Sequence, residues 1–363
     1  MTVGIAREKV GMGRVHTVTG EVDPGRLGGV LSHEHLLSLL VGPWMSRGYP
    51  VGPDEGAREV EDAARFAEDQ INAAVVALRG LPALGVGTIV DLSPYGDAGR
   101  DARGDNVRLL SEIARRSGIN VVSGTATYRA EFSPQWTIDA SVDDLARRFI
   151  EDATTGIGHT GVRAGILGEQ PTSLDTMTPH EEKGLRAAAR AHHATGLAIS
   201  THTTHGTMAL EQVDLLAEEG CDLQRVVIGH MDNHPDLDYI RRVLDRGVNI
   251  GFDSIGKQHW DVRLPTPPPD HPEGPYTKRA IKQSDHTRAS WLATLIDAGY
   301  RHQILLSHDL SGGQVWLNPT THGTYGYTYL ATAFAALLTN AGVSTTDLDI
   351  LLRDNPARLL SID

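Results

Sequence analysis

Residues 28–35 read Gly-Gly-Val-Leu-Ser-His-Glu-His, a short apolar run that ends in two histidines one residue apart. Glycines precede the run and polar residues follow it, which is typical of a buried strand bounded by turns. Alternation along a strand sends residues i and i+2 to the same face, so we expect His33 and His35 to point the same way. The stretch therefore predicts a buried strand whose end presents two imidazoles to one place.

Seven further short apolar runs follow, and each is bounded by glycine or polar residues. The eight runs lie at residues 28–32, 87–91, 121–125, 162–167, 198–201, 226–229, 248–252 and 303–307. Stretches with helical spacing separate them, for example at residues 62–79, 181–195, 208–219 and 237–245, and a short closing helix is expected from residue 355. Eight apolar strands separated by helices predict a parallel sheet closed into an α/β (β/α)8 TIM barrel. A doubly wound open sheet is the alternative, although no G-x-G-x-x-G pattern follows the first run.

The length of 363 residues fits one barrel of about 250 residues with added loops, so we expect residues 1–363 to form a single domain. Long loops are expected after the seventh and eighth strands. Residues 264–270 read Leu-Pro-Thr-Pro-Pro-Pro-Asp, which is too rich in proline for a helix or a central strand. We therefore expect residues 257–290 to form a loop insertion over the active site, because loops that follow barrel strands surround the active-site mouth.

Composition is ordinary for a globular protein, with 40% hydrophobic and 22% charged residues. The net charge of −13 comes without a Lys/Arg-rich run, which argues against nucleic acid or a membrane as partner and favours a small-molecule substrate. Cys221 is the only cysteine, so no disulfide is expected within the chain. The sequence lacks a signal-like or membrane-spanning apolar segment, and we expect a cytoplasmic location.

Further candidate metal ligands follow the later strands. Glu169, His202, His230 and Asp309 lie at the expected ends of strands four, five, six and eight. Catalytic groups in TIM barrels come from these strand ends, so the four side chains are expected to meet the two histidines of the first strand. Imidazole and carboxylate without thiolate suit zinc, and also Mn, Co or Fe. Because six ligands exceed the needs of one ion and a carboxylate can bridge, the sequence predicts two divalent metal ions, with Zn²⁺ as the first choice.

Six motifs spread over nearly the whole chain carry a family resemblance. They are Leu31-Ser32-His33-Glu34-His35, Ser200-Thr201-His202-Thr203, Ile228-Gly229-His230, Gly251-Phe252-Asp253, Leu306-Ser307-His308-Asp309 and Asn355-Pro356-Ala357-Arg358. Together they resemble the phosphotriesterase family of the amidohydrolase superfamily. Phosphotriesterases proper bridge their metals with a carboxylated lysine on strand four, whereas residues 165–169 here read Gly-Ile-Leu-Gly-Glu. That pattern is similar to the phosphotriesterase homology protein branch, in which a glutamate is the bridge.

The resemblance implies a role for each ligand. The more buried metal would be held by His33, His35 and Asp309. The more exposed metal would be held by His202 and His230, with Glu169 and a hydroxide bridging the two. The metals would polarise a substrate C=O and lower the pKa of the bridging water towards 7, and the hydroxide would attack. Asp309, the expected catalytic residue, would take up the proton and pass it to the leaving group.

The resemblance also implies a reaction class. The favoured function is hydrolysis of a lactone, carboxyl ester or amide, since residues 307–309 are similar to the lactonase form of the strand-eight motif. One alternative is phosphoester or phosphotriester hydrolysis, which the glutamate bridge makes the weaker choice. A second alternative is a catalytically inactive metal-binding scaffold, against which Asp309 argues because only turnover needs a proton shuttle. The family often forms homodimers, and a homodimer is expected here.

Candidate pocket residues lie in the loops after the strands. They are Asp232, Asp253, Lys257, Tyr128, Trp44 and Tyr325. The two aspartates either orient a ligand histidine or relay a proton, or they cap helices. The lysine either pairs with a carboxylate, phosphate or sulfonate on the substrate or lies exposed, and the aromatic residues either wall an apolar pocket or simply pack. Histidines near the same rim that we do not assign as ligands are His205, His234, His308 and His322, and the pair His192-His193 is expected on a helix surface.

Overall fold

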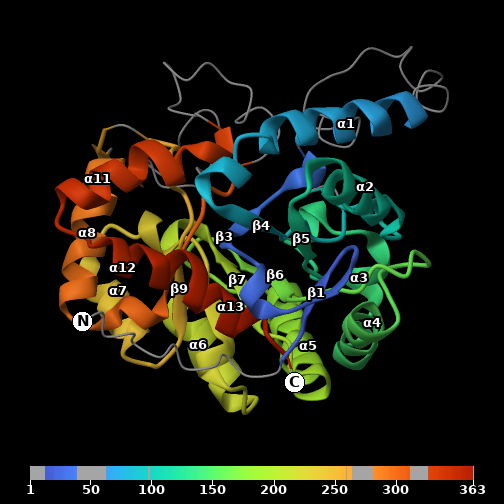
Figure 1. Ribbon diagram of the computed structural model, residues 1–363. Coiled ribbons are helices and arrows are strands. Elements are labelled where there is room, and N and C mark those ends of the chain that lie inside the picture. The colour runs from blue at the N-terminus through green and yellow to red at the C-terminus, as the bar shows by residue number, and fades with distance from the viewer. Residues whose placement is uncertain are drawn as a thin grey trace, which may run out of the picture.

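The computed structural model describes residues 13–38, 63–96, 99–258, 260–263, 281–310 and 326–362. Its centre consists of eight parallel strands. They are β3 (Gly29–Glu34), β4 (Val86–Asp91), β5 (Asn120–Ser123), β6 (Leu167–Thr172), β7 (Ile199–Thr203), β8 (Val226–Ile228), β9 (Asn249–Phe252) and β12 (Ile304–Leu306). The strands form two hydrogen-bonded ladders, β3-β4-β5 and β6-β7-β8-β9-β12, which helices surround in Figure 1. The predicted (β/α)8 barrel is confirmed.

Two seams join the ladders into a barrel, and the first lies between β5 and β6. Gly124 and Ile166 pair there through their backbones, and Thr125 N donates to Ile166 O at 3.0 Å. Next to this seam β6 lies very close to β7. The close approach requires glycine at position 168, since a Cβ there would be 2.6 Å from the carbonyl oxygen of Ser200. Backbone contacts therefore close this side of the barrel.

The second seam, between β12 and β3, depends on side chains. Ser32 Oγ donates to Leu306 O at 3.1 Å, and Ser307 Oγ accepts from His33 N at 3.0 Å. The backbone also contributes, since Asp309 N donates to His33 O at 3.1 Å. The first and last strands are thus held together at the level of the first predicted metal ligand.

The Glu34 carboxylate, which is 0% exposed, lies at the centre of this second seam. Its Oε1 accepts hydrogen bonds from Ser307 Oγ at 2.8 Å, His308 N at 3.0 Å and His308 Nδ1 at 2.8 Å. Its Oε2 accepts from Leu310 N at 2.9 Å. The other ring nitrogen of His308 accepts from Leu330 N at 3.0 Å, so this imidazole is neutral and donates through Nδ1. One carboxylate therefore fixes the whole segment that leads to Asp309.

The covering helices follow the strands in sequence order. They are α1 (Ala63–Leu78), α2 (Arg108–Ser117), α3 (Gln135–Asp139), α4 (Val142–Thr154), α5 (Pro179–Thr195), α6 (Ala209–Glu218), α7 (Leu237–Leu244) and α8 (Asp285–Asp297). Local sequence explains where several begin and end. Thr178 and Glu181 form a reciprocal capping box with Pro179 in the first turn of α5, and Gly196 ends that helix in the left-handed conformation.

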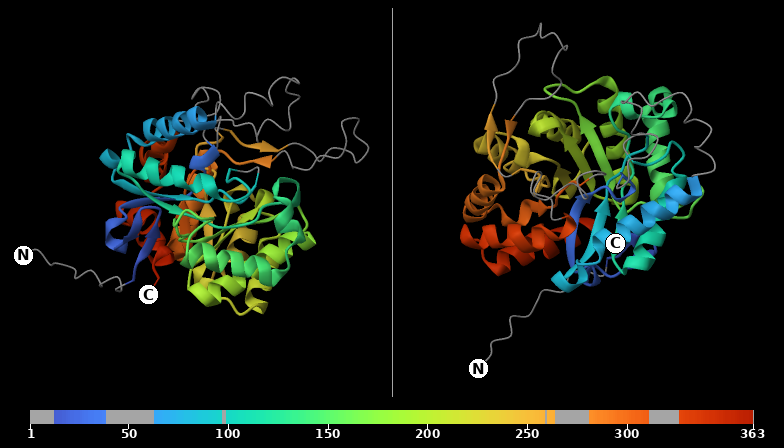
Figure 2. Two further views of the ribbon diagram at one scale, coloured as in Figure 1. Left: turned by 90° about the vertical axis from the view of Figure 1, so that its right-hand side faces the viewer. Right: turned by 90° about the horizontal axis from the view of Figure 1, so that it is seen from above.

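The remaining elements lie near the chain ends and in one insertion. They are β1 (Val15–Thr17), β2 (Gly20–Val22), β10 (Val262–Arg263), β11 (Ile281–Lys282), α11 (Ala335–Asn340), α12 (Thr345–Asp349) and α13 (Asn355–Leu360). An antiparallel bridge between Arg14 and Ile362 joins the two ends of the described chain. The paired strands β10 and β11 project from the barrel in both views of Figure 2. None of the described helices is long and apolar enough to cross a bilayer.

Alternation along the strands divides the apolar side chains between two buried clusters. The inner cluster, in the barrel, includes Val30, Val90, Val122, Val227 and Leu305. The outer cluster, between strands and helices, includes Leu31, Ile89, Val121, Ile228 and Ile304. Neighbouring residues of these five strands thus belong to opposite clusters, as a parallel sheet buried on both faces requires.

The fourth strand differs from its predicted position. The sequence predicts it at residues 162–167, whereas β6 runs from Leu167 to Thr172, and all six of its residues are buried. Residues 162–166 look strand-like because all but Arg163 are apolar or glycine, but Ala164 N donates to Asp152 O on α4 instead of continuing a ladder. The true strand contains Gly168, Glu169 and Gln170, whose polarity hides it from a search for apolar runs.

The structure corrects parts of two other sequence predictions, the insertion at residues 257–290 and the position of the pair His192-His193. Residues 285–290 of the expected insertion at 257–290 belong to α8, where Ser284 caps the helix by accepting from Thr287 N. His193 is exposed as expected, but His192 is buried and its Nδ1 donates to Leu197 O at 2.7 Å, so the surface prediction is wrong for His192. The proline-rich residues 264–280 lie outside the described residues.

We expect Glu34→Gln to lower the free energy of unfolding by about 3 kcal/mol, because an amide group would turn a donor towards N–H groups that now bond to a buried carboxylate. Urea denaturation followed by circular dichroism measures the change. Glu151→Gln, on the exposed face of α4, is the matched control and should change stability by less than about 0.5 kcal/mol. Equal effects of the two substitutions would contradict the role assigned to Glu34.

Candidate metal centre

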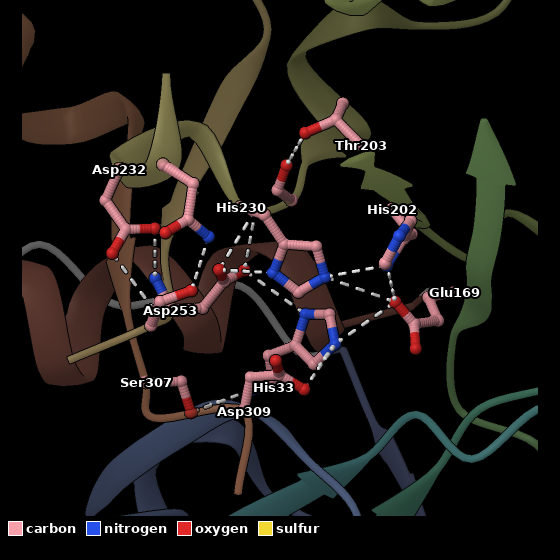
Figure 3. A network of polar contacts seen from close by, with 12 residues as sticks. His33, Glu169, His202, Thr203, His230, Asp232, Asp253, Ser307 and Asp309 are labelled. Atoms are coloured by element: carbon pink, nitrogen blue, oxygen red, sulfur yellow. Dashed lines mark hydrogen bonds and ion pairs between the residues drawn. The ribbon is translucent and has the colours of Figure 1, made fainter. Parts of the chain in front are cut away.

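All six predicted ligands lie together at the end of the barrel where the strands finish. Figure 3 shows Glu169 among the imidazoles. Its Oε2 lies 3.4 Å from His33 Nε2, 3.0 Å from His202 Nδ1 and 3.5 Å from His230 Nε2. Its Oε1 lies 3.4 Å from His35 Nε2. One carboxylate therefore contacts four imidazoles that come from the ends of three different strands, β3, β7 and β8.

Two groups of potential ligands share that carboxylate. One consists of His33, His35 and Glu169, and the other of Glu169, His202 and His230, with donor atoms within 4.8 Å of one another in each group. Asp309 borders the first group, because its Oδ1 lies 3.0 Å from His35 Nε2. Each of the two groups could hold a metal ion, and Glu169 belongs to both.

Two of the six positions have a positive φ angle. His230 and Asp309 have φ angles of 58° and 52°, in the left-handed region that side chains other than glycine rarely adopt. Such a conformation costs about 1–2 kcal/mol and is concentrated at functional sites. His230 lies two residues after the end of β8, and Asp309 lies three residues after the end of β12.

Asp253, which the sequence nominates to orient a ligand, contacts one histidine of each group. Its Oδ1 accepts from His230 Nδ1 at 2.8 Å, and its Oδ2 lies 3.2 Å from His33 Nδ1. Both contacts use Nδ1 and leave Nε2 directed at Glu169, which is how carboxylates fix the orientation of metal-bound histidines. Gly251 makes room for this, since a Cβ there would lie 2.2 Å from Asp253 Oδ2.

Asp232 contacts the backbone next to Asp253 rather than a candidate ligand. Its carboxylate accepts from Asp253 N at 3.3 Å and Ser254 N at 3.2 Å, and it forms an ion pair with Arg288 Nε at 2.5 Å. Within the described part of the chain it makes no hydrogen bond to a ligand histidine. Its contacts therefore position the segment that carries Asp253, rather than a ligand itself.

The buried carboxylates of Glu169 and Asp253 favour positive charge on or near the imidazoles between them. Burial lowers the pKa of His33, but Glu169 and Asp253 more than offset this and raise it to about 10. Burial raises the pKa of Glu169, but His33 and His202 hold it well below its ordinary value. For His202, burial and the neighbouring His230 lower the pKa. Protons on the imidazoles or divalent cations between them can meet this demand.

The residues present fit divalent cations. The donor set is nitrogen and oxygen without thiolate, which suits zinc and its neighbours. Both ring nitrogens of His33 are buried and lack a well-aligned hydrogen bond to any described residue, although each lies within 3.4 Å of a carboxylate oxygen. His202 Nδ1 and His230 Nε2 lie 2.8 Å apart and can share only one proton. A cation would satisfy these lone pairs together.

A cavity of about 240 Å³ opens onto the site. Tyr128, Lys257 and Asp309 line it, as the sequence predicts for the first two. Tyr128 OH lies 3.4 Å from His202 Nδ1, and burial followed by the nearby Glu169 raises its pKa well above 10, so the phenol is neutral. Lys257 Nζ contacts Asp309 Oδ2, and this lysine holds the pKa of Asp309 below its usual range despite burial. Trp44 and Tyr325 lie outside the described residues.

The unassigned histidines have varied positions. His205 lines the cavity. His234 stacks on Tyr239 with ring centroids 4.1 Å apart, and His308 is the buried partner of Glu34. His322 lies outside the described residues. His234 and His308 thus have structural contacts that explain them.

Three residues near the site escape the sequence reasoning. The position of Glu34 could have been used, because it lies between two predicted ligands at a strand end. An acid there has little access to water, which predicts a buried carboxylate. Arg129 follows Tyr128 in the same loop and lines the cavity, so the rule that selects Tyr128 would have selected it too. Arg288 lies on α8, far along the chain from Asp232, and nothing local in the sequence predicts their ion pair.

Comparisons with characterised proteins identify relatives over most of the chain. The profile of the Phosphotriesterase family matches residues 13–360. The Phosphotriesterase homology protein of Escherichia coli (strain K12) is 37% identical over 255 residues, covering 70% of this chain and 79% of that protein. Its crystal structure with phosphate in the active site superposes with a TM-score of 0.72 at 32% identity, over 93% of this chain and 100% of that one.

Two relatives have different activities in their names. N-acetyltaurine hydrolase of Dictyostelium discoideum is 29% identical over 300 residues, covering 81% of this chain and 75% of that protein. Aryldialkylphosphatase of Saccharolobus solfataricus is 29% identical over 304 residues, covering 81% of this chain and 87% of that protein. The relatives therefore include one enzyme named for an amide and one named for a phosphate ester.

Asp253→Asn should weaken metal binding about tenfold to a hundredfold, because an amide can accept from one imidazole only by turning its own N–H towards the other. Competition with a coloured chelator, with metal content read by mass spectrometry, measures the affinity. Asp238→Asn, with a side chain 83% exposed on α7, is the matched control. If the Asp253 variant binds metal as tightly as the control, Asp253 does not orient the ligands.

Proposed function

Because this chain belongs to the phosphotriesterase family, we propose that it is a binuclear metal-dependent hydrolase that cleaves a lactone, carboxyl ester or amide. The observation that carries the proposal is Glu169, which lies between two histidine pairs. His33, His35 and Asp309 would hold one ion. His202 and His230 would hold the other, and Glu169 would be shared. Zinc is the proposed metal, since the donors are imidazole and carboxylate.

Bound ions of this kind polarise a carbonyl and lower the pKa of water, which supplies both an electrophile and a nucleophile. The remaining work falls to the side chains. Asp309 is the most exposed of the six candidate ligands at 21% and faces the cavity through its carboxylate. In this proposal it would accept a proton from the attacking water and deliver it to the leaving group. Lys257, in contact with Asp309 Oδ2, would orient the carboxylate for that transfer.

Tyr128 is the proposed hydrogen-bond donor to the substrate. Its hydroxyl lies at the cavity wall 3.4 Å from His202 Nδ1, the nitrogen that also faces Glu169. A metal ion on that nitrogen would leave the hydroxyl to donate to a bound substrate. The neutral phenol required for this is the form that burial favours.

Phosphotriester hydrolysis is the second candidate, and the similarity to aryldialkylphosphatase of Saccharolobus solfataricus favours it. Carbonyl hydrolysis is preferred because the similarity to N-acetyltaurine hydrolase is as extensive and the candidate bridge is a glutamate. An inactive scaffold is the weakest candidate, since Asp309 retains the position of a proton shuttle beside a cavity.

A substrate panel separates the three candidates. We expect about two divalent ions per chain by mass spectrometry, and hydrolysis of N-acetyltaurine, a γ-lactone or an aryl acetate with kcat/KM about 100-fold above that for an aryl dialkyl phosphate. Removal of the ions with a chelator should abolish activity, and zinc should restore it. Preference for the phosphate ester would support the second candidate. Tightly bound zinc without any hydrolysis would support the scaffold.

Asp309→Asn should lower kcat by a factor of about 10²–10⁴, because the amide cannot accept the proton. The variant is compared with Asp143→Asn, which removes an aspartate whose side chain is 78% exposed on α4. Metal content is measured on both proteins, so loss of an ion is distinguished from loss of proton transfer. Full turnover by Asp309→Asn with two ions bound would show that Asp309 does not transfer the proton.

A further inference from the structure

Arg129 lies in the wall of the cavity, in the loop that follows β5. Its side chain is 18% exposed. The guanidinium carbon is 5.0 Å from the centroid of the Phe132 ring and 5.7 Å from that of Tyr128. Two aromatic faces of the same loop thus hold the group in place, an arrangement that stabilises a cation without neutralising it.

The three arginine and lysine side chains in the described part of the cavity wall differ in how their charge is balanced. Arg288 is 1% exposed and pairs with two buried carboxylates, Asp232 at 2.5 Å and Asp285 at 3.1 Å. Lys257 pairs with Asp309. The charges of Lys257 and Arg288 are therefore already balanced by carboxylates of the protein.

Arg129, in contrast, has only a weak partner among the described residues. Its Nε lies 3.5 Å from Glu131 Oε1, and the Glu131 side chain is 57% exposed, so water screens this pair. The Nε atom is buried and makes no hydrogen bond to a described residue. The guanidinium charge is therefore only weakly balanced, so it can attract an anionic group that enters the cavity.

Arg129 is also close enough to the metal centre for one small molecule to reach both. Both are neighbours of Tyr128, whose ring centroid is 5.7 Å from the guanidinium carbon and 5.3 Å from the His202 ring centroid. The cavity of about 240 Å³ is smaller than the usual 300–1,000 Å³ of drug-sized sites, which suits a compact substrate.

We propose that Arg129 binds an anionic group of the substrate, a carboxylate or sulfonate, while the scissile carbonyl lies at the metal centre. This inference rests on the proposed hydrolase function and narrows its substrate class. The substrate is then a small acyl compound with a negative charge a few bonds from the carbonyl, such as an N-acyl amino acid, an N-acyl aminosulfonate or a half-ester of a dicarboxylic acid. Planar bidentate recognition of such groups is what guanidinium does best.

Matched substrates test the proposal. N-acetyl-β-alanine and its carboxamide form an amide pair, and monomethyl succinate and its carboxamide form an ester pair. In each pair a neutral carboxamide of similar size replaces the carboxylate. We expect the metal-loaded wild type to prefer the anion, and Arg129→Gln to lower the ratio of kcat/KM for anion over carboxamide about tenfold to a hundredfold. Arg129→Lys should lower it less, because the charge remains but the planar fork is lost.

The control is Arg108→Gln, which removes an arginine whose side chain is 66% exposed on α2. It should leave the anion preference as in the wild type. An unchanged ratio in Arg129→Gln would overturn the proposal, and so would a wild type without preference for the anion.

A binding measurement separates this inference from the hydrolase proposal. The ketone 5-oxohexanoate replaces the amide N–H of N-acetyl-β-alanine by CH₂ and cannot be hydrolysed. Calorimetry with metal-loaded protein should show tighter binding of 5-oxohexanoate than of its carboxamide, and Arg129→Gln should remove the difference. If that holds while no substrate is turned over, the hydrolase function fails and the anion site stands. Equal binding of the two ketones by the wild type would reject the anion site by itself.

Discussion

The buried carboxylate of Glu34 is the contact on which both the barrel and its site depend. The first and last strands meet without a continuous ladder, and Glu34 accepts four hydrogen bonds from the segment 307–310 across that gap. Because Glu34 lies between His33 and His35, the hydrogen bonds that join the first and last strands also hold the segment that leads to Asp309 beside those histidines.

Around the other ligands, buried charges alternate in sign. Glu169 contacts four imidazoles, Asp253 contacts His33 and His230 from behind, and Asp232 holds the Asp253 segment while pairing with Arg288. A buried charge is costly unless it is paired, so each of these buried charged groups needs the neighbour that pairs with it. This pairing explains why polar residues are buried in the barrel mouth. The contacts of Asp253 also keep the Nε2 atoms of His33 and His230 directed at Glu169.

Much of this was predictable from sequence, for identifiable reasons. Parallel barrel strands all end at the same place, so residues far apart in the chain, such as His33 and His230, can be brought together from strand position alone. The prediction is weakest where polarity replaces hydrophobicity inside a strand: β6 was placed five residues too early because Glu169 and Gln170 are buried within it. Pairings between distant elements, such as Arg288 with Asp232, depend on tertiary geometry that no local pattern encodes.

The structure separates the parts that would do chemistry from the parts that would choose the substrate. Candidate ligands come from strand ends, where ladders and buried carboxylates hold them rigidly. Arg129 is held mainly by Tyr128 and Phe132, within five residues of one loop. A change in that loop would alter the charge of the cavity wall while the contacts of Glu169 and Asp253 remained. Such an arrangement allows relatives named for an amide and for a phosphate ester to share one fold, since the reaction centre and the determinants of substrate charge lie on different structural supports.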